Sequence, residues 1–129
     1  MKSILVWIYL LNVVFLILHE IDGAYWKEWR FFGTFGRSLS DRSGLSVYLY
    51  AHIPIFTVLL YGLVSLELLQ GRIISLFFSG FMICHFFLHL LFKMKGHEGF
   101  DSPVSKLIFS GTLALSIIQL AATLRVMGE

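Results

Sequence analysis

Charged residues are scarce in this sequence. Only 14% of its 129 residues are Asp, Glu, Lys or Arg, whereas 57% are hydrophobic. The mean hydropathy of +0.81 lies outside the range of soluble globular domains and within that of membrane proteins. The formal net charge of +2 is too small to indicate a nucleic-acid partner.

Cysteine is nearly absent as well. Cys84 is the only cysteine, which excludes an intrachain disulfide and a cysteine-based zinc module. We expect Cys84 to be a small apolar packing residue. The sequence also lacks the HxxHH motifs that are typical of histidine-rich membrane oxygenases.

Four hydrophobic runs make up most of the chain. They cover about residues 4–21, 45–69, 73–92 and 104–126, and each is long enough for a transmembrane helix. The polar run Gln70-Gly71-Arg72 is expected to form a tight turn between the second and third spans. The sequence therefore predicts an all-α fold, a four-helix transmembrane bundle formed by residues 1–129 as a single integral membrane domain.

The segment after the first run is rich in aromatic residues. Tyr25, Trp29 and Phe32 recur at a helical spacing, which predicts a short interfacial amphipathic helix with these rings toward the lipid. The charged side chains between them are expected to face water; they are Lys27, Glu28 and Arg30. Residues 33–44 are rich in Gly and Ser and predict a flexible loop.

The last run contains several small residues. They are Ser110, Gly111, Ala114, Ala121 and Ala122. Small side chains let transmembrane helices approach closely. We therefore expect this helix either to pack tightly within the bundle or to join a homo- or hetero-oligomer.

The five histidines are expected to gather at one level. His19 lies at the end of the first run, His52 lies early in the second, and His85 and His89 lie near the end of the third. Because successive spans alternate in direction, these residues and His97 fall in the same half of the bilayer. A histidine inside an apolar span is costly unless something binds it. The histidines therefore predict a shared polar site.

The spacing of these residues suits a metal ion. His85 and His89 are four residues apart and His19 and Asp22 are three apart, so each pair shares one face of a helix. Helical bundles build metal sites from such inward-facing histidines and carboxylates, and imidazole is a common ligand of zinc and iron. The predicted metal ligands are His19, Asp22, His52, His85 and His89. A divalent transition metal is expected, with zinc preferred and iron as the alternative.

Three functions remain open from the residues alone. The preferred one is a zinc-dependent membrane hydrolase of a lipid-like substrate, with Glu20 as catalytic general base for a metal-bound water. The second is a haem-binding electron-transfer or sensor module in which His52 and either His85 or His89 are the axial ligands. The third is a non-enzymatic accessory subunit of a membrane complex.

Four short motifs follow one another along the chain. They are His19-Glu20-Ile21-Asp22, Lys27-Glu28-Trp29-Arg30, His52-Ile53-Pro54 and His85-Phe86-Phe87-Leu88-His89. Their order, HE-x-D, KEWR, HIP and H-x3-H, resembles that of an uncharacterised family of small bacterial four-span membrane proteins. The first motif is also distantly similar to the HXXEE-type membrane proteins. The resemblance implies the four-span fold and the importance of the motif residues, and it implies no particular reaction.

Basic residues are unevenly distributed between the two ends of the predicted bundle. The loops after the first and third spans hold seven of the ten Lys and Arg residues, and the opposite end holds Lys2, Arg72 and Arg125. Cytoplasmic loops carry the excess of Lys and Arg. This distribution predicts a multi-pass protein of the bacterial inner membrane, with both of these loops and the histidine site in the cytoplasmic half and both termini outside.

Overall fold

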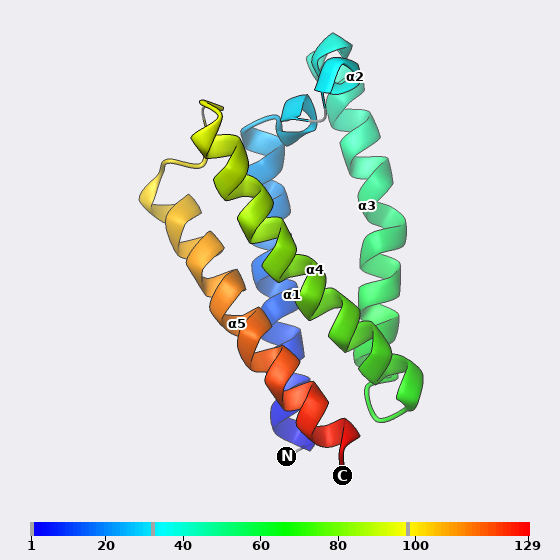
Figure 1. Ribbon diagram of the computed structural model, residues 1–129. Coiled ribbons are helices and arrows are strands. Elements are labelled where there is room, and N and C mark those ends of the chain that lie inside the picture. Colours follow the sequence, from blue (N-terminus) through cyan, green and yellow to red (C-terminus); the bar gives the residue numbers. More distant parts are fainter. Residues whose placement is uncertain (1, 32, 98) are drawn as a thin grey trace.

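The computed structural model describes residues 2–31, 33–97 and 99–129, and over these residues the fold consists of helices (Figure 1). The long ones are α1 (Lys2–Tyr25), α3 (Asp41–Val64), α4 (Leu69–Met94) and α5 (Pro103–Met127). All four are long and apolar enough to cross a membrane, which confirms the predicted four-helix architecture. Two short elements, η1 (Glu28–Phe31) and α2 (Gly33–Ser38), connect α1 to α3. Both termini lie at the end of the bundle opposite to these elements (Figure 1).

Helices α1, α4 and α5 form the tightly packed part of the bundle. Side chains such as Leu5, Leu16 and Met82 form an apolar core between them. Burial of each large apolar side chain stabilises a soluble fold by about 1.5–3 kcal/mol. Between helices in lipid, however, close packing and interhelical hydrogen bonds carry more of the stability.

The inner face of α5 supplies such hydrogen bonds. The Asn12 amide of α1 donates to Ser116 Oγ at 3.0 Å and to Gln119 Oε1 at 2.8 Å. The Gln119 amide in turn donates to Ser75 Oγ of α4 at 3.0 Å. All four side chains are fully buried, so this polar network joins the three helices in the half of the bundle that contains the termini.

The small residues of α5 lie elsewhere than we expected. Ser110, Ala114 and Ala121 are exposed, and only Gly111 and Ala122 are half-buried. Polar residues that find partners on α1 and α4 occupy the inner face instead. Of the two alternatives, packing within the bundle therefore does not apply to these three residues, and their role in an oligomer stays a prediction.

Helix α3 is the outlying member of the bundle. Near its C-terminal end the Tyr9 hydroxyl donates to Leu59 O at 2.9 Å. A Cβ atom at Gly62 would lie 2.4 Å from Tyr9 Oη and 2.5 Å from Ile74 Cγ2, so α3 touches α1 and α4 there. Toward its N-terminal end α3 leans away from both helices (Figure 1). The bundle is closed at the end with the termini and open at the other end.

The connection between α3 and α4 differs from the prediction. Helix α3 ends at Val64 and α4 begins at Leu69, so Gln70, Gly71 and Arg72 form the first turn of a helix rather than a tight turn. The Arg72 guanidinium donates to Glu67 O, just before α4, at 3.1 Å.

The segment after α1 is more ordered and more buried than expected. Helix α1 continues to Tyr25, and a 3₁₀ turn, η1, replaces the predicted amphipathic helix. Trp29 is buried, but Glu28 is buried too and does not face water. Phe32, which we expected to join this face, lies outside the described residues.

The predicted loop at residues 33–44 is also helical for most of its length. Helix α2 occupies part of it, and α3 begins at Asp41 rather than at residue 45. The reason is a capping interaction, because the Ser40 hydroxyl accepts a hydrogen bond from the Ser43 N–H at 3.2 Å. Such an N-cap stabilises a helix start by about 1 kcal/mol.

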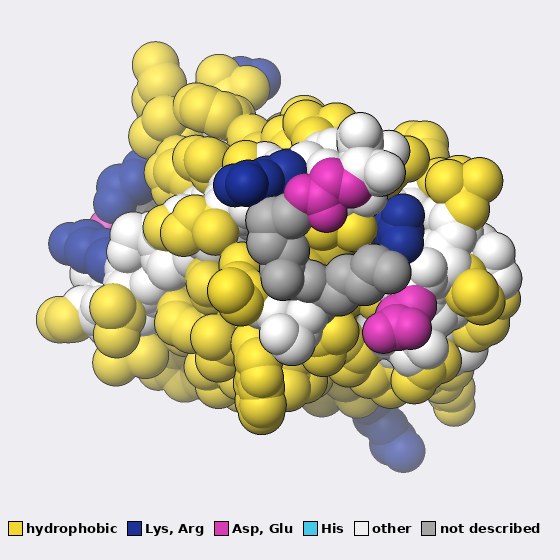
Figure 2. All heavy atoms as spheres, turned by 90° about the horizontal axis from the view of Figure 1, so that it is seen from below, with side chains coloured by type: hydrophobic (Ala, Val, Ile, Leu, Met, Phe, Trp, Pro, Cys, Tyr) yellow, Lys and Arg dark blue, Asp and Glu magenta, His cyan; other side chains and the backbone are white. Residues whose placement is uncertain are grey.

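The end with the termini carries few polar groups. Seen from this end, hydrophobic side chains form the rim of the molecule, and acidic and basic side chains are sparse (Figure 2). No histidine of the described residues is visible on this face (Figure 2). His19 near the end of α1, and His85 and His89 near the end of α4, lie toward the opposite end of the bundle.

Candidate metal centre

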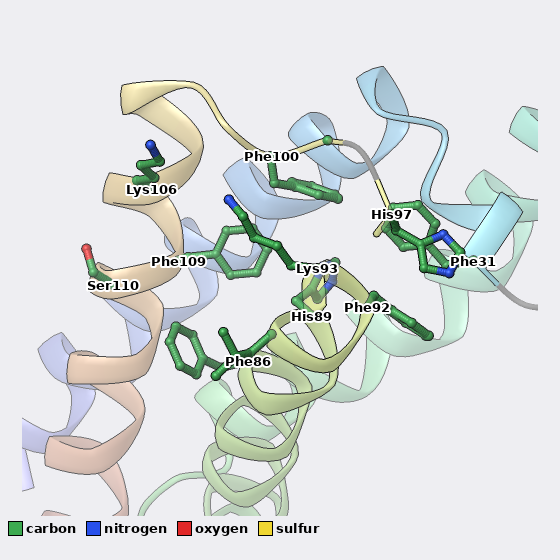
Figure 3. Close-up of a pocket in the computed structure, with 12 residues that line it drawn as sticks. Phe31, Phe86, His89, Phe92, Lys93, His97, Phe100, Lys106, Phe109 and Ser110 are labelled. Carbon is green, nitrogen blue, oxygen red and sulfur yellow. The ribbon is translucent and has the colours of Figure 1, made fainter. Parts of the chain in front are cut away.

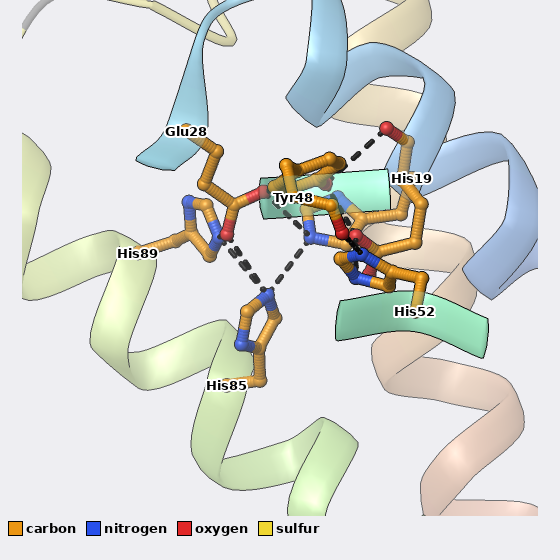
Figure 4. Close-up of polar contacts among 7 residues, drawn as sticks. His19, Glu28, Tyr48, His52, His85 and His89 are labelled. Carbon is orange, nitrogen blue, oxygen red and sulfur yellow. Dashed lines mark hydrogen bonds and ion pairs between the residues drawn. The ribbon is translucent and has the colours of Figure 1, made fainter. Parts of the chain in front are cut away.

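Three imidazoles and one carboxylate converge inside the open half of the bundle (Figure 4). The Nε2 atom of His85 lies 2.8 Å from that of His19 and 3.0 Å from that of His89. Glu28 Oε1 lies 2.9 Å from His89 Nε2 and 3.6 Å from His85 Nε2. One ligand atom from each of the four residues lies within 4.8 Å of all the others. We call this set the HHHE cluster.

Three different elements position the four side chains of the HHHE cluster. His85 and His89 lie one turn apart on α4, and His19 lies on the facing side of α1. Glu28 reaches the cluster because the chain turns sharply after α1, with Lys27 in the left-handed conformation (φ 58°). A residue other than glycine adopts this conformation at a cost of about 1–2 kcal/mol. The turn directs the carboxylate back into the bundle.

A glycine on α1 makes room for this carboxylate. A Cβ atom at Gly23 would lie 2.3 Å from Glu28 Oε2 and 2.5 Å from Tyr48 Oη. Only glycine lets both side chains approach α1 so closely.

Hydrogen bonds alone satisfy the HHHE cluster only in part. An imidazole nitrogen offers either one N–H or one lone pair, but His85 Nε2 faces the ring nitrogens of both His19 and His89. A cation at the centre would accept all three lone pairs at once. A tetrahedral zinc ion about 2.0–2.1 Å from its nitrogens holds them roughly 3.3 Å apart, so the rings would need to spread by a few tenths of an ångström.

The electrostatics around Glu28 favour a charged ligand. Burial by itself would raise the pKa of its carboxyl, because only 4% of the residue is exposed. The hydrogen bond from His89 and the neighbouring imidazoles outweigh this effect and hold the pKa below its ordinary value. Glu28 is therefore an anion at neutral pH, and an anion inside a bundle needs a cation or several donors.

Aromatic rings surround the HHHE cluster on the side of α5. The Phe109 ring lies 4.8 Å from the His19 ring and 4.7 Å from the His89 ring, and the Phe100 ring lies 4.9 Å from His89. These apolar rings lower the local dielectric. Interactions between charges are stronger in such surroundings.

A second polar group lies beside the HHHE cluster. His52 Nε2 of α3 lies 2.7 Å from Glu20 Oε2 of α1, and its Nδ1–H donates to Tyr48 O at 2.6 Å. Because Nδ1 carries this hydrogen, the contact between Nε2 and the carboxylate holds one further shared proton. The Tyr48 hydroxyl donates to the Glu20 carboxylate and lies 3.3 Å from Glu28 Oε2. Tyr48 thus links a proton-carrying pair to the HHHE cluster.

Three of the five predicted metal ligands meet in the structure. They are His19, His85 and His89. His52 lies outside the HHHE cluster and faces Glu20 instead. Asp22 also lies outside it, although one of its carboxylate oxygens is buried without a hydrogen-bond partner.

Glu28 is the member of the HHHE cluster that the sequence analysis missed. Its charged neighbours suggested a side chain facing water, and the spacing between α1 and η1 gives no helical register that places it inside. The only signal was its position within the KEWR motif. Glu20, the predicted catalytic residue, lies next to the cluster through Tyr48 rather than within it.

A large apolar groove leads to both polar groups. It has a volume of about 970 Å³ and runs between α3 and α4, with η1 and α2 at its upper end. His85, Glu20 and His52 lie at this end, and each keeps 13–15% of its side chain exposed. The polar groups are therefore accessible from the groove.

A smaller cavity of about 300 Å³ approaches the HHHE cluster from the other side (Figure 3). It lies between α4 and α5, and His89 forms part of its wall. Its lining is mostly aromatic, but Lys93 and Lys106 also belong to it. Lys93 donates to Asp101, which holds the pKa of that carboxyl below its ordinary value.

The fold and the site define a class of protein: a four-helix bundle suited to a membrane, with a buried His/Glu cluster at one end. Within this class, the chain belongs to the family of unknown function DUF6713, whose model matches residues 5–126. The predicted membership of an uncharacterised family is confirmed, whereas the bacterial origin and the link to HXXEE-type proteins stay predictions. Neither a curated protein nor a solved structure matches the chain.

Proposed function

We propose that this protein is a metal-dependent membrane hydrolase that acts on a lipid-like substrate. The observation that carries the proposal is the convergence of three Nε2 atoms and one carboxylate in the HHHE cluster. His19, His85, His89 and Glu28 would hold a divalent transition metal, with zinc preferred because imidazole and carboxylate are its usual ligands.

Glu28 is the ligand that we expect water or substrate to displace during a reaction. Glu28 Oε1 lies 2.9 Å from His89 Nε2, but the Glu28 oxygens lie 3.6 Å from His85 Nε2 and 3.9 Å from His19 Nε2. Catalytic metal sites keep one position open for water or substrate, whereas structural sites are closed. A bound metal would supply Lewis acidity and lower the pKa of a water molecule.

The neighbouring pair supplies proton transfer. In ester hydrolysis the water oxygen bonds to the electrophilic atom, the bond to the leaving oxygen breaks, and the proton lost by water ends on that oxygen. Glu20 and His52 share a proton and lie beside the HHHE cluster, so they would accept this proton and return it. General acid–base catalysis of this kind contributes about 10²–10⁴-fold to a rate.

The two other interpretations gain no support from the geometry. A haem would need His52 opposite His85 or His89, but His52 Nε2 faces Glu20 at 2.7 Å. An accessory subunit would not need a converging set of ligands next to a proton-carrying pair.

Metal analysis of the protein purified in detergent tests the proposal. We expect one divalent metal ion per chain and an absorbance spectrum without a haem Soret band. The His85→Ala and His89→Ala variants should lose the metal, and His52→Ala should keep it as a matched control. Full metal content in a His85→Ala/His89→Ala double variant would refute the metal site.

A hydrolysis assay with a panel of long-chain acyl and phosphoryl esters tests the reaction. Glu20→Gln should lower turnover by about 10²–10⁴-fold without loss of metal. Equal turnover by Glu20→Gln and the unaltered protein would show that Glu20 takes no part in the reaction.

A further inference from the structure

We infer that the groove between α3 and α4 holds the hydrocarbon part of a membrane lipid, which enters sideways from the bilayer and places its polar head at the HHHE cluster. This inference rests on the proposed function, because it names how the substrate of that site is bound. The groove is distinct from the small cavity beside α5.

Several apolar side chains on the walls of the groove are exposed. Phe77 and Phe81 of α4 are 76% and 57% exposed, and Ile55 and Val58 of α3 are 40% and 52% exposed. All four side chains line the groove. They belong to helices that are apolar enough to cross a membrane, so lipid chains are the medium that surrounds the groove in a bilayer.

The groove is polar at one end and apolar along the rest of its length. Its polar residues, such as Glu20, His52 and His85, all lie at the end near η1 and α2, and apolar side chains line the rest. An amphiphile fits this division in one orientation only, with its head at the HHHE cluster and its tail toward the middle of the bilayer.

The part of the groove below the HHHE cluster fits one leaflet. From His85 to Ile74, which lines its lower end, α4 rises by roughly 16 Å at 1.5 Å per residue. Half of a hydrocarbon core of about 30 Å is roughly 15 Å. The close approach of α3 to Tyr9 and Ile74 at Gly62 then closes the groove. This stop sets an upper limit to the chain that the groove accepts.

Photo-crosslinking tests the inference without any need for catalysis. The probe is a lysophospholipid with a diazirine near the middle of its acyl chain, added to the protein in lipid nanodiscs, and mass spectrometry maps the labelled residues. We expect labelling of groove residues on α3 and α4 such as Ile55 and Phe81. Labelling spread evenly over the outer surfaces of all four spans would overturn the inference.

A matched pair of variants sharpens this test. Val58 lines the groove and Leu60 does not, although each is 52% exposed on α3. The indole of Val58→Trp would fill part of the groove and should lower labelling of the groove residues about tenfold. Leu60→Trp should leave the labelling unchanged. Equal labelling of both variants would contradict the inference.

A competition experiment on the unaltered protein does not depend on how these variants fold. Unlabelled lysophospholipids with long chains should suppress labelling of the groove, whereas short-chain ones should not. Metal content is measured on the same preparations. Bound metal without localised labelling would refute the groove as the lipid site but leave the metal site intact. Localised labelling without bound metal would refute the metal site but leave the groove as the lipid site.

Discussion

Glu28 is the single residue on which the character of the HHHE cluster depends most. Without it, three imidazoles would face one another with no anion to balance a bound cation. With it, the cluster has the donor set of a divalent metal site. Its place beside Tyr48 also connects the cluster to the pair formed by Glu20 and His52.

We predict that Glu28→Gln keeps the metal but binds it more weakly, because three imidazoles remain while the only anionic ligand is lost. Affinity should fall by more than the roughly 10–100-fold that is lost with a carboxylate that only supports a ligand. Titration with a competing chelator measures this change. An unchanged affinity would show that Glu28 does not contact the ion.

The stability of the metal-free protein should fall at low pH, and Glu28 should account for part of this fall. The pKa of Glu28 is lower in the folded state than in the unfolded state. Its contribution to folding stability is therefore complete above the unfolded pKa of about 4.3. It is lost as the pH falls through the folded pKa. Glu28→Gln should flatten the fall in thermal stability below about pH 4.3. A fall of the same size in both proteins would contradict this account.

Asp22 offers a second test at the level of one residue. Its Oδ2 atom and the Nδ1 atom of His19 are both buried without partners, and the two residues lie three apart on α1. Histidine ligands of metals usually donate their other N–H to a carboxylate, which orients the ring. No hydrogen bond joins the two atoms in the structure. We expect one to form when a cation holds the His19 ring, so that Asp22 positions His19 rather than binds the metal itself.

Asp22→Asn should weaken metal binding by about 10–100-fold and leave the number of ligands unchanged. The chelator titration gives the affinity, and the spectrum of a cobalt-substituted sample reports the coordination number. A changed coordination number in Asp22→Asn would restore Asp22 to the ligand set that the sequence predicted.

At the scale of the elements, the position of α3 decides whether the groove exists. The helix is held at its C-terminal end by the contact of Gly62 with Tyr9 and Ile74, and it diverges toward the HHHE cluster (Figure 1). This arrangement needs a residue without a Cβ atom at the point of contact.

Gly62→Ala should destabilise the protein, because the added Cβ would lie 2.4 Å from Tyr9 Oη. Overpacking of this kind costs about 1–3 kcal/mol. Gly80→Ala on α4 is the matched control, since a Cβ there meets no atom within 4 Å and alanine favours a helix by about 1 kcal/mol. Thermal unfolding in detergent measures both, and equal melting temperatures would contradict the close approach of α3.

The elements also show what a single sequence can predict. The spans are evident because hydropathy reports the one property that a transmembrane helix requires. The histidines on α1 and α4 could be brought together because helical spacing and alternating direction fix their depth. The burial of Glu28 depends on a turn at Lys27 with a positive φ, and no periodic pattern encodes such a turn. The hydrogen bonds of Asn12 were equally hidden, because the serines and the one glutamine of α5 do not reveal in the sequence which face they occupy.

At the scale of the whole molecule, the orientation in the membrane stays a prediction. The end with η1 and α2 carries more Lys and Arg residues than the end with the termini, and the positive-inside rule would place it in the cytoplasm. Substitution of Cys84 by Ser leaves a chain without cysteine, into which Ser38→Cys or Gly128→Cys is introduced.

A membrane-impermeant maleimide then reads the orientation in intact bacterial spheroplasts. Both positions are exposed. The variant Gly128→Cys should react from outside, and Ser38→Cys should react only after the membrane is permeabilised. The reverse pattern would place the HHHE cluster and its groove in the outer half of the bilayer.

The most direct measurement of the central claim is X-ray absorption spectroscopy at the edge of the metal that purifies with the protein. The account predicts a first shell of three imidazole nitrogens and one oxygen ligand from Glu28 or water, with metal–nitrogen distances of about 2.0–2.1 Å for zinc. The multiple scattering that is typical of histidine rings should be present in the unaltered protein, and the metal edge itself should be lost in His85→Ala/His89→Ala. A shell that contains sulfur, or one without imidazole scattering, would contradict the account.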